Sequence, residues 1–119
     1  MKSKSIIIVL CIVLVSCISC EKSKDVVLKE IGPVKVKSGQ GFNMIPKGVS
    51  AMWANVENAT PFTVIVWDGT ELITSFKSSN FLTAEVPLEL YSKPGKYEIY
   101  LFDKKYKKKS NSLYVVSEK

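Results

Sequence analysis

The side chains with the clearest covalent chemistry in this sequence are three cysteines, Cys11, Cys17 and Cys20, all within its first 20 residues. Cys17 directly follows the small residue Ser16, at the end of an apolar run that begins near Ile6. A small residue at this place is typical of the cleavage site of a targeting segment. No cysteine follows Cys20, so we expect the folded domain to hold neither a disulfide nor a thiolate metal site.

The apolar run has the length of a signal segment and is too short for a membrane-spanning helix. Ser5 to Val15 is apolar almost throughout, whereas a spanning helix needs about 20 apolar residues. Lys2 and Lys4 precede the run, as in the basic first region of a signal peptide. Residues 1–16 are therefore predicted to be a signal peptide.

The junction Leu14-Val15-Ser16-Cys17 resembles the lipobox of bacterial lipoproteins, which has an aliphatic residue, a small residue and then a cysteine. The resemblance implies that the Cys17 thiol forms a thioether to diacylglycerol, with palmitate-type chains, before cleavage makes Cys17 the mature N-terminus. Cys20 is the weaker alternative, because the residue three places before it is Cys17 and not Leu. Plain secretion and an uncleaved anchor are the remaining alternatives.

Lipidation at Cys17 would place the protein at the cell envelope, because two acyl chains hold a protein durably on a membrane. In a host with two membranes we expect the outer membrane, since Ile18 stands where an Asp would resemble an inner-membrane retention signal. Residues 17–29 are predicted to be the lipidated N-terminus and a short tether. Residues 30–119 are predicted to be the folded domain.

The composition disfavours catalysis and nucleic-acid binding. The sequence has 119 residues, no His, and a formal net charge of +6. His is the usual general base near neutral pH and the commonest metal ligand. All the cations are Lys, and the Arg fork that reads phosphates and guanine edges is absent. We therefore expect no enzymatic activity, no cofactor, no metal site and no nucleic-acid partner.

After the tether, short segments with strand patterns alternate with turn sequences. Val34–Lys37 reads as an edge strand, and Asp68-Gly69 favours a tight hairpin. No segment of ten or more residues carries a helical apolar stripe. About seven short strands predict an all-β fold, an immunoglobulin-like antiparallel β-sandwich. The other predicted strands are Ser50–Glu57, Thr63–Trp67, Leu72–Phe76, Phe81–Val86, Lys96–Phe102 and Ser112–Val116.

Three motifs in the second half of the domain resemble those of IPT/TIG domains, an immunoglobulin-like family. They are a strand that ends in Val86-Pro87, a Pro94-Gly95 turn into an aliphatic strand, and Ser110-Asn111 before the last strand. The first half matches less well, since the glycine-rich opening is reduced to Gly39-Gln40-Gly41-Phe42. The resemblance implies an adhesive or spacer role and carries no catalytic residues across.

The alternation of side chains along each strand predicts which face points into the core. The predicted core residues are Met52, Ala54, Val56, Val64, Val66, Leu82, Ala84, Val86, Tyr97, Ile99, Leu101, Leu113 and Val115. The third, sixth and seventh strands are neighbours in an immunoglobulin-like sheet, so the opposite side chains share its outer face. That candidate binding face comprises Ile65, Trp67, Tyr100, Phe102 and Tyr114, with Val116 at its border.

Exposed aromatic side chains on one sheet face indicate an association surface. We expect either stacking on sugar rings, contact with a protein, or a homodimer formed sheet to sheet. The competing interpretation is that the N-terminal segment covers the face, or that the aromatics only favour strand formation. A register shift of one residue would exchange the two faces.

A second candidate site is the basic loop of the last hairpin, made of Lys104, Lys105, Lys107, Lys108 and Lys109 around Tyr106. It is suited to an anionic polymer or lipid phosphate, whereas the competing interpretation is a solvated hairpin tip. Asp68, Glu71 and Asp103 do not have the spacing of a calcium loop, and Asp68 is expected to be a turn residue.

These observations favour a non-catalytic, membrane-anchored lipoprotein that binds protein or glycan. The first alternative is a structural or accessory subunit of an envelope assembly. A remote alternative is an envelope hydrolase, for which only Ser, Lys, Asp, Glu and Tyr side chains are present as nucleophile and base.

Overall fold

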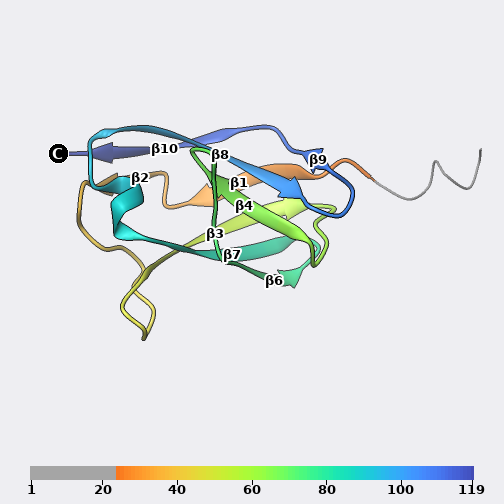
Figure 1. Ribbon diagram of the computed structural model, residues 1–119, viewed down its shortest axis with the longest axis horizontal. Helices are drawn as coiled ribbons and strands as arrows, with labels where there is room; N and C mark the ends of the chain where they lie inside the picture. The colour runs from red at the N-terminus through yellow and green to blue at the C-terminus, as the bar shows by residue number, and fades with distance from the viewer. Residues whose placement is uncertain (1–23) are drawn as a thin grey trace, which may run out of the picture.

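The computed structural model describes residues 24–119, so the predicted signal peptide and the lipidation site at Cys17 or Cys20 lie outside the described residues. The described chain folds as an all-β, immunoglobulin-like sandwich of two sheets (Figure 1). Within residues 24–119, no helix is long and apolar enough to cross a membrane.

The first sheet has four strands in the order β1-β3-β7-β6, and all its neighbours are antiparallel. The second has the order β2-β10-β8-β4-β5, with β9 paired to β8. Its one parallel pair is β2 with β10. The strands are β1 (Val27–Gly32), β2 (Lys35–Lys37), β3 (Ser50–Glu57), β4 (Thr63–Trp67), β5 (Thr70–Glu71), β6 (Thr74–Ser78), β7 (Phe81–Val86), β8 (Gly95–Asp103), β9 (Lys108–Lys109) and β10 (Leu113–Glu118), and a 3-10 helix η1 spans Leu88–Tyr91.

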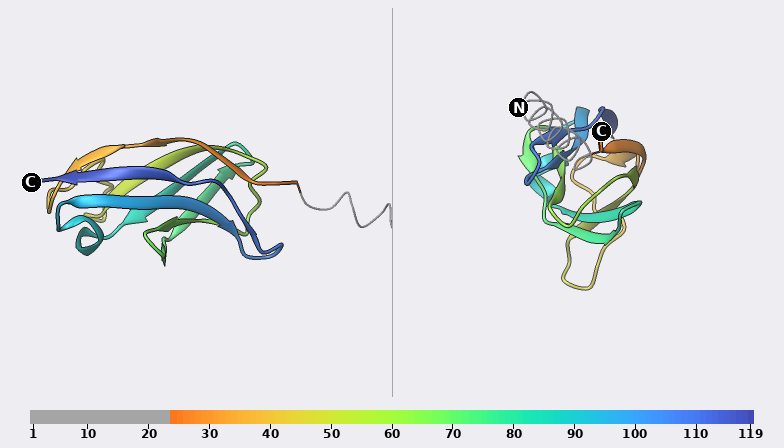
Figure 2. Two further views of the ribbon diagram at one scale, coloured as in Figure 1. Left: turned by 90° about the horizontal axis from the view of Figure 1, so that it is seen from above. Right: turned by 90° about the vertical axis from the view of Figure 1, so that its right-hand side faces the viewer.

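The N-terminal strands belong to both sheets. β1 pairs with β3, and the chain then crosses through the cis Gly32-Pro33 bond to pair β2 with β10. Gly32 lies against the ring of Trp53, where a Cβ atom would clash with the indole. The two sheets therefore face each other across one core (Figure 2). β1 forms an edge of the first sheet and β2 an edge of the second.

Most predicted strands are confirmed, and three of them, Ser50–Glu57, Thr63–Trp67 and Phe81–Val86, have the predicted bounds. The Asp68-Gly69 hairpin is also confirmed, since both residues have positive φ and Trp67 pairs with Thr70. The predicted tether, residues 17–29, is too long, because β1 begins at Val27. Val26 and Leu28 are buried in the core, so the domain starts several residues before 30.

The predicted core is confirmed in β3 and β7, where one residue in two is buried. In β8 it is confirmed for Ile99 and Leu101, whereas Tyr97 is half-buried against the core. It is wrong in β4. Ile65 and Trp67 have no exposed surface and belong to the core, whereas Val64 and Val66 point to the outer side. The two faces of β4 are therefore exchanged relative to the prediction, and Ile65 and Trp67 are removed from the candidate binding face.

Trp67 occupies the centre of an aromatic cluster at the end of the sandwich that holds η1. Its indole N–H donates to the carbonyl oxygen of Leu90 at 3.1 Å, and its ring lies 6.4 Å from Tyr91 and 5.8 Å from Tyr97. The Tyr97 hydroxyl donates to the carbonyl oxygen of Lys93 at 2.6 Å. A buried Trp on the third strand and a Tyr whose hydroxyl bonds to upstream backbone are both hallmarks of immunoglobulin-like sandwiches.

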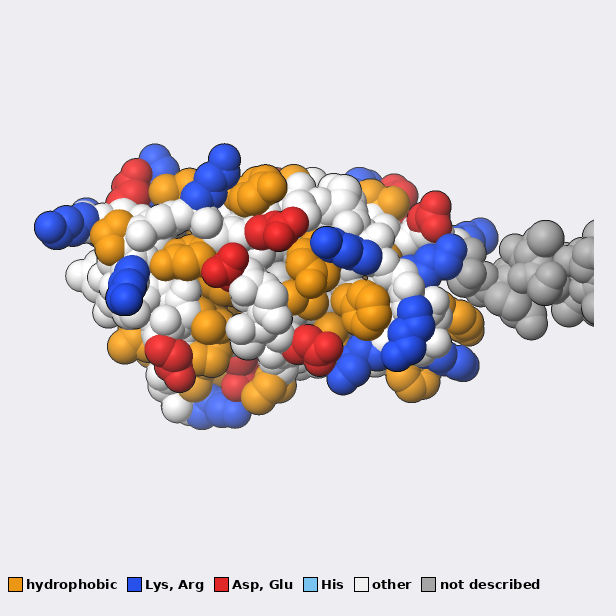
Figure 3. All heavy atoms as spheres, turned by 45° about the horizontal axis from the view of Figure 1, so that its top comes forward, with side chains coloured by type: hydrophobic (Ala, Val, Ile, Leu, Met, Phe, Trp, Pro, Cys, Tyr) orange, Lys and Arg blue, Asp and Glu red, His pale blue; other side chains and the backbone are white. Residues whose placement is uncertain are grey.

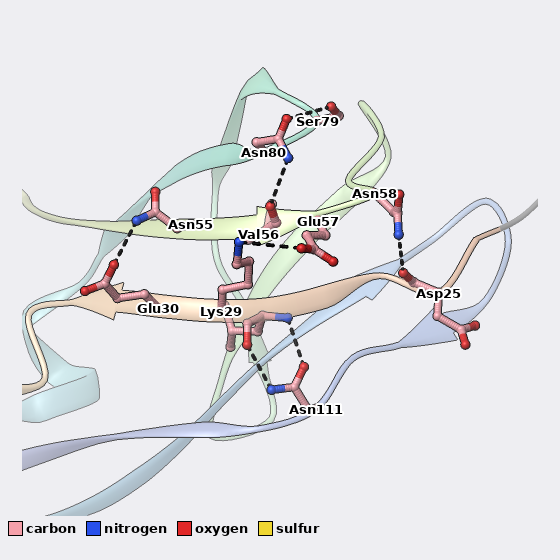
Figure 4. A network of polar contacts seen from close by, with 11 residues as sticks. Asp25, Lys29, Glu30, Asn55, Val56, Glu57, Asn58, Ser79, Asn80 and Asn111 are labelled. Carbon is pink, nitrogen blue, oxygen red and sulfur yellow. Dashed lines mark hydrogen bonds and ion pairs between the residues drawn. The ribbon is translucent and has the colours of Figure 1, made fainter.

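Asn111 ties the first strand to the segment before the last one. Its side-chain oxygen accepts from the Leu28 N–H at 2.9 Å, and its side-chain nitrogen donates to the Leu28 carbonyl at 2.9 Å. Figure 4 shows this amide directed at the backbone of β1. The Asn111 side chain thus replaces the backbone of a neighbouring strand as the hydrogen-bond partner of Leu28. It joins the two sheets at one edge.

Trp67→Ala is expected to lower the free energy of unfolding by about 3–5 kcal/mol, because it empties a fully buried aromatic site and leaves the Leu90 carbonyl without its donor. Urea denaturation followed by far-UV circular dichroism measures the change. Trp53→Ala is the matched control, since that ring is half-buried outside the core cluster. Equal losses for the two variants would contradict the placement of Trp67.

Candidate binding face and basic loop

The outer face of the six-stranded sheet carries apolar side chains on three strands. Pairing sets Val64 opposite Phe102 and Val66 opposite Tyr100. On the other side of β8, Tyr114 of β10 lies opposite Glu98. Tyr100 and Phe102 are half-buried, and Tyr114 is 46% exposed. We call these five residues, Val64, Val66, Tyr100, Phe102 and Tyr114, the aromatic face.

Lysine side chains lie over the rings of this face. The Lys109 ammonium is 4.3 Å from the centre of the Tyr100 ring, and the Lys96 ammonium is 4.7 Å from that of Tyr114. Both distances fit a cation–π contact. Figure 3 shows apolar side chains spread over this side of the molecule, with blue lysine side chains crowded at its right-hand end. The surface therefore combines flat apolar rings with positive charge.

Val66 is the most closely packed residue of the aromatic face. It lies on the outer side of the sheet and outside the core cluster, yet it is only 3% exposed. Tyr100 and Glu71 are its pairing neighbours on either side. Packing between neighbours holds the face in one shape before a partner arrives, which reduces the ordering cost of binding.

The other sheet has a more polar outer surface along β1 and β3. Lys29 pairs with Glu57 at 3.5 Å, and the Asn55 amide donates to Glu30 at 2.9 Å (Figure 4). These groups already satisfy one another across the strand boundary. The aromatic face is consequently the better candidate for a partner.

The basic loop between β8 and β9 is built around the buried carboxylate of Asp103, which is 3% exposed. One oxygen accepts from the hydroxyls of Thr60 at 2.6 Å and Thr63 at 3.1 Å. The other accepts from the backbone N–H groups of Lys105 at 3.0 Å and Tyr106 at 2.9 Å. Asp103 therefore fixes the path of the lysine-rich backbone against the loop before β4.

Two opposing effects act on the pKa of Asp103. Burial by itself raises it, because the charged form loses water. The hydrogen bonds from the Thr60 hydroxyl, the Tyr106 amide and the other two donors outweigh burial and hold the pKa below its ordinary value of 3.8. The carboxylate is therefore ionised at neutral pH and carries a structural role.

The structure places the remaining predicted site residues as follows. Tyr100, Phe102 and Tyr114 lie together on the outer face, and Lys109 joins them through Tyr100. Lys104, Lys105, Lys107 and Lys108 lie at one end of the sandwich, next to the loop before β4. Sequence reasoning missed Val64 and Val66 on the face and Phe62 beside the loop. The side of β4 that faces the core could have been predicted from Trp67. β4 is the third of the strands predicted from the sequence, and the Trp on that strand is buried in such sandwiches.

Comparison with protein-family models and with curated proteins found no match for this chain. Among the described residues, no group of three His, Cys, Asp or Glu side chains is placed to hold a metal ion.

Asp103→Ala is expected to lower the free energy of unfolding by about 3 kcal/mol at pH 7, because buried hydroxyl and amide donors lose a charged acceptor. The folded-state pKa is lowered, so the unfolded state binds protons more readily. The contribution of Asp103 is complete above pH 3.8 and is lost as the pH falls through its folded-state pKa. Urea unfolding of both proteins over a pH series measures the gap.

The matched control is Glu118→Ala, which removes a half-exposed carboxylate whose ion pair with Lys35 is solvated. We expect a change within about 0.5 kcal/mol for this variant. A gap between Asp103→Ala and the wild type that stays constant down to strongly acid pH would show that the carboxylate charge does not matter.

Proposed function

We propose that the protein is a non-catalytic lipoprotein of the cell envelope, anchored through Cys17, whose aromatic face binds a protein or glycan partner. The observation that carries the binding role is the band of Tyr100, Phe102 and Tyr114 on one sheet face, with lysine ammonium groups over two of its rings. Aromatic rings supply large contact area at small entropic cost, and they stack on sugar rings as well as on protein surfaces.

Anchoring is supported by the sequence before the domain. The lipobox-like Leu14-Val15-Ser16-Cys17 follows a basic and then apolar segment. Within residues 24–119 the core begins at Val26, which lies after the proposed cut before Cys17. A lipid-anchored chain of this kind belongs on the outer membrane of a host with two membranes, since Ile18 follows the cysteine.

The resemblance to IPT/TIG domains also supports an adhesive role. Its motifs fall at strand ends: Val86-Pro87 closes β7, Pro94-Gly95 opens β8, and Ser110-Asn111 precedes β10. Asn111 there makes the paired hydrogen bonds to Leu28. We therefore propose membership of that family as the source of the fold.

The alternative is a structural subunit of a larger envelope assembly, or a homodimer through the same face. The edge strand β6 favours it, because four of its five residues are exposed and Phe76 is 39% exposed. An exposed edge offers unpaired backbone groups to another chain. The size of the protein in detergent extract distinguishes the two: a monomer that still binds a partner through the aromatic face supports the binding role.

The Cys17 anchor predicts the mass of the mature protein. Intact-mass spectrometry of the membrane fraction should show a chain that begins at Cys17 and carries diacylglycerol. Cys17→Ser should abolish the modification and leave an unprocessed chain, whereas Cys20→Ser should change the mass only by the substitution itself. A lipidated product from Cys17→Ser would assign the anchor to Cys20.

The aromatic face predicts which substitutions weaken binding. Tyr100→Ser combined with Tyr114→Ser should lower affinity for envelope glycan or protein by about tenfold or more, because central aromatic residues dominate interface energies. Surface plasmon resonance with purified wall polysaccharides and with envelope proteins provides the measurement. Phe76→Ser is the matched control, being an exposed aromatic on the other sheet. Equal affinity of all three proteins for every partner would exclude the face.

A further inference from the structure

One end of the sandwich gathers positive charge and exposed aromatic rings. Five lysines fall within the six residues from 104 to 109. Phe62, from the loop before β4, is 49% exposed, and Tyr106 is 38% exposed. The Lys105 ammonium lies 5.2 Å from the Phe62 ring centre and 5.3 Å from that of Tyr106. We call Phe62, Lys104, Lys105, Tyr106, Lys107 and Lys108 the basic tip.

The basic tip has a defined shape. Lys105 and Tyr106 donate their amides to the buried Asp103 carboxylate, and Lys107 donates its own to the Asp103 carbonyl at 2.8 Å. The Lys104 amide donates to the carbonyl of Phe62 at 3.1 Å, which joins the two loops. The backbone therefore displays its lysine side chains in a fixed direction.

Much of the charge on the basic tip is not neutralised by its neighbours. Lys104 pairs with Glu71 and Lys108 with Asp25, both at 3.1 Å. Within residues 24–119, Lys105 and Lys107 form no ion pair, and both are exposed. The buried Asp103 carboxylate beneath them accepts four hydrogen bonds from neutral groups and forms no ion pair among the described residues. The surface thus presents positive charge flanked by rings that can enter a headgroup layer.

The described chain begins at this same end. Asp25 contacts Lys108 through its carboxylate and accepts from the Asn58 amide at 2.7 Å through its carbonyl. Six residues lie between Cys17 and Lys24, so the Cα atoms of the two are at most about 25 Å apart. An anchor at Cys17 would therefore hold the basic tip close to the bilayer, while the C-terminal end of β10 points away (Figure 1).

We propose that the basic tip docks on the anionic phospholipid surface of the membrane that holds the anchor, with Phe62 and Tyr106 at headgroup level. This proposal rests on the proposed Cys17 anchor. Each lysine near an anionic surface raises the affinity of the protein for the membrane about fivefold. Aromatic side chains are favoured at the membrane–water interface. Docking stands the sandwich on its end, so the aromatic face is turned sideways and stays open to a partner.

The test uses the purified mature protein reconstituted in two kinds of vesicle, phosphatidylcholine alone and phosphatidylcholine with about one-third phosphatidylglycerol. Lysines are acetylated briefly and mapped by mass spectrometry. In the anionic vesicles, we expect Lys105 and Lys107 to react about fivefold more slowly than in the neutral ones. Lys37 and Lys93, at the opposite end, should react equally in both, and about 1 M salt should remove the difference.

Matched variants separate the basic tip from net charge. Lys105→Gln with Lys107→Gln should abolish the protection of the neighbouring Lys104 and Lys108. Lys37→Gln with Lys93→Gln removes the same charge from the far end and should leave that protection unchanged. Equal labelling of Lys104 and Lys108 in both vesicle types, or equal effects of the two variants, would overturn the proposal. Soluble polyphosphate that protects the tip as well as the vesicles do would assign a free polyanion instead, and would also overturn it.

Vesicle flotation distinguishes a failure of the docking proposal from a failure of the proposed Cys17 anchor. Protein that floats with neutral vesicles but shows no protection in anionic ones is anchored and undocked, which refutes the docking alone. Protein that fails to float with neutral vesicles refutes the Cys17 anchor, whatever the labelling shows.

Discussion

The fold depends on the contact between Trp67 and Tyr91, because the described domain contains no cysteine and must hold its two sheets together without a disulfide. Trp67 reaches from β4 to the carbonyl of Leu90 at 3.1 Å. Tyr91 then hydrogen-bonds through its hydroxyl to Ser50 of β3 at 2.6 Å, and its carbonyl accepts from Ser117 of β10 at 3.1 Å. Two buried rings and three hydrogen bonds thus connect strands of both sheets, and a buried polar network of this kind fixes one arrangement because every member is satisfied.

The strands could be predicted from the sequence wherever polar residues fixed the phase of the alternation. In β7, Thr83 and Glu85 mark the solvent side, and the opposite residues are buried as expected. β4 offers no such mark, because Val64 to Trp67 is apolar throughout. The core side of this strand is buried, and on its outer side Val64 and Val66 lie beside Phe102 and Tyr100, so hydrophobicity alone cannot tell the sides apart. Only the size of Trp67 and its place on β4, the third of the strands predicted from the sequence, indicate which side faces the core.

In the candidate site, likewise, features made of consecutive residues could be predicted, and contacts between residues far apart in the sequence could not. The lysine loop is visible in the sequence because its residues are consecutive. Its support is not, since Asp103 binds the hydroxyls of Thr60 and Thr63, about 40 residues earlier. Likewise, β1 is not predicted, because it lies in a partly polar segment. Its residue Leu28 is hydrogen-bonded by Asn111, 83 residues further along the chain. Pairings at such distances follow from the order of strands in the sheets, which only the folded chain defines.

The two proposed surfaces are mechanically linked through the hairpin of β8, β9 and β10. Lys109 lies over Tyr100 of the aromatic face, and the adjacent Lys108 reaches Asp25 beside the tether. Asp103, opposite Lys108 in the ladder, anchors the loop between them. A membrane that binds the basic tip would therefore act on the same short hairpin that positions Tyr100. Because Val66 in the face is already only 3% exposed, docking would change the orientation of the face more than its shape. The direction in which an anchored module presents its binding surface is then set by the lysine loop, and the surface itself by the sheet.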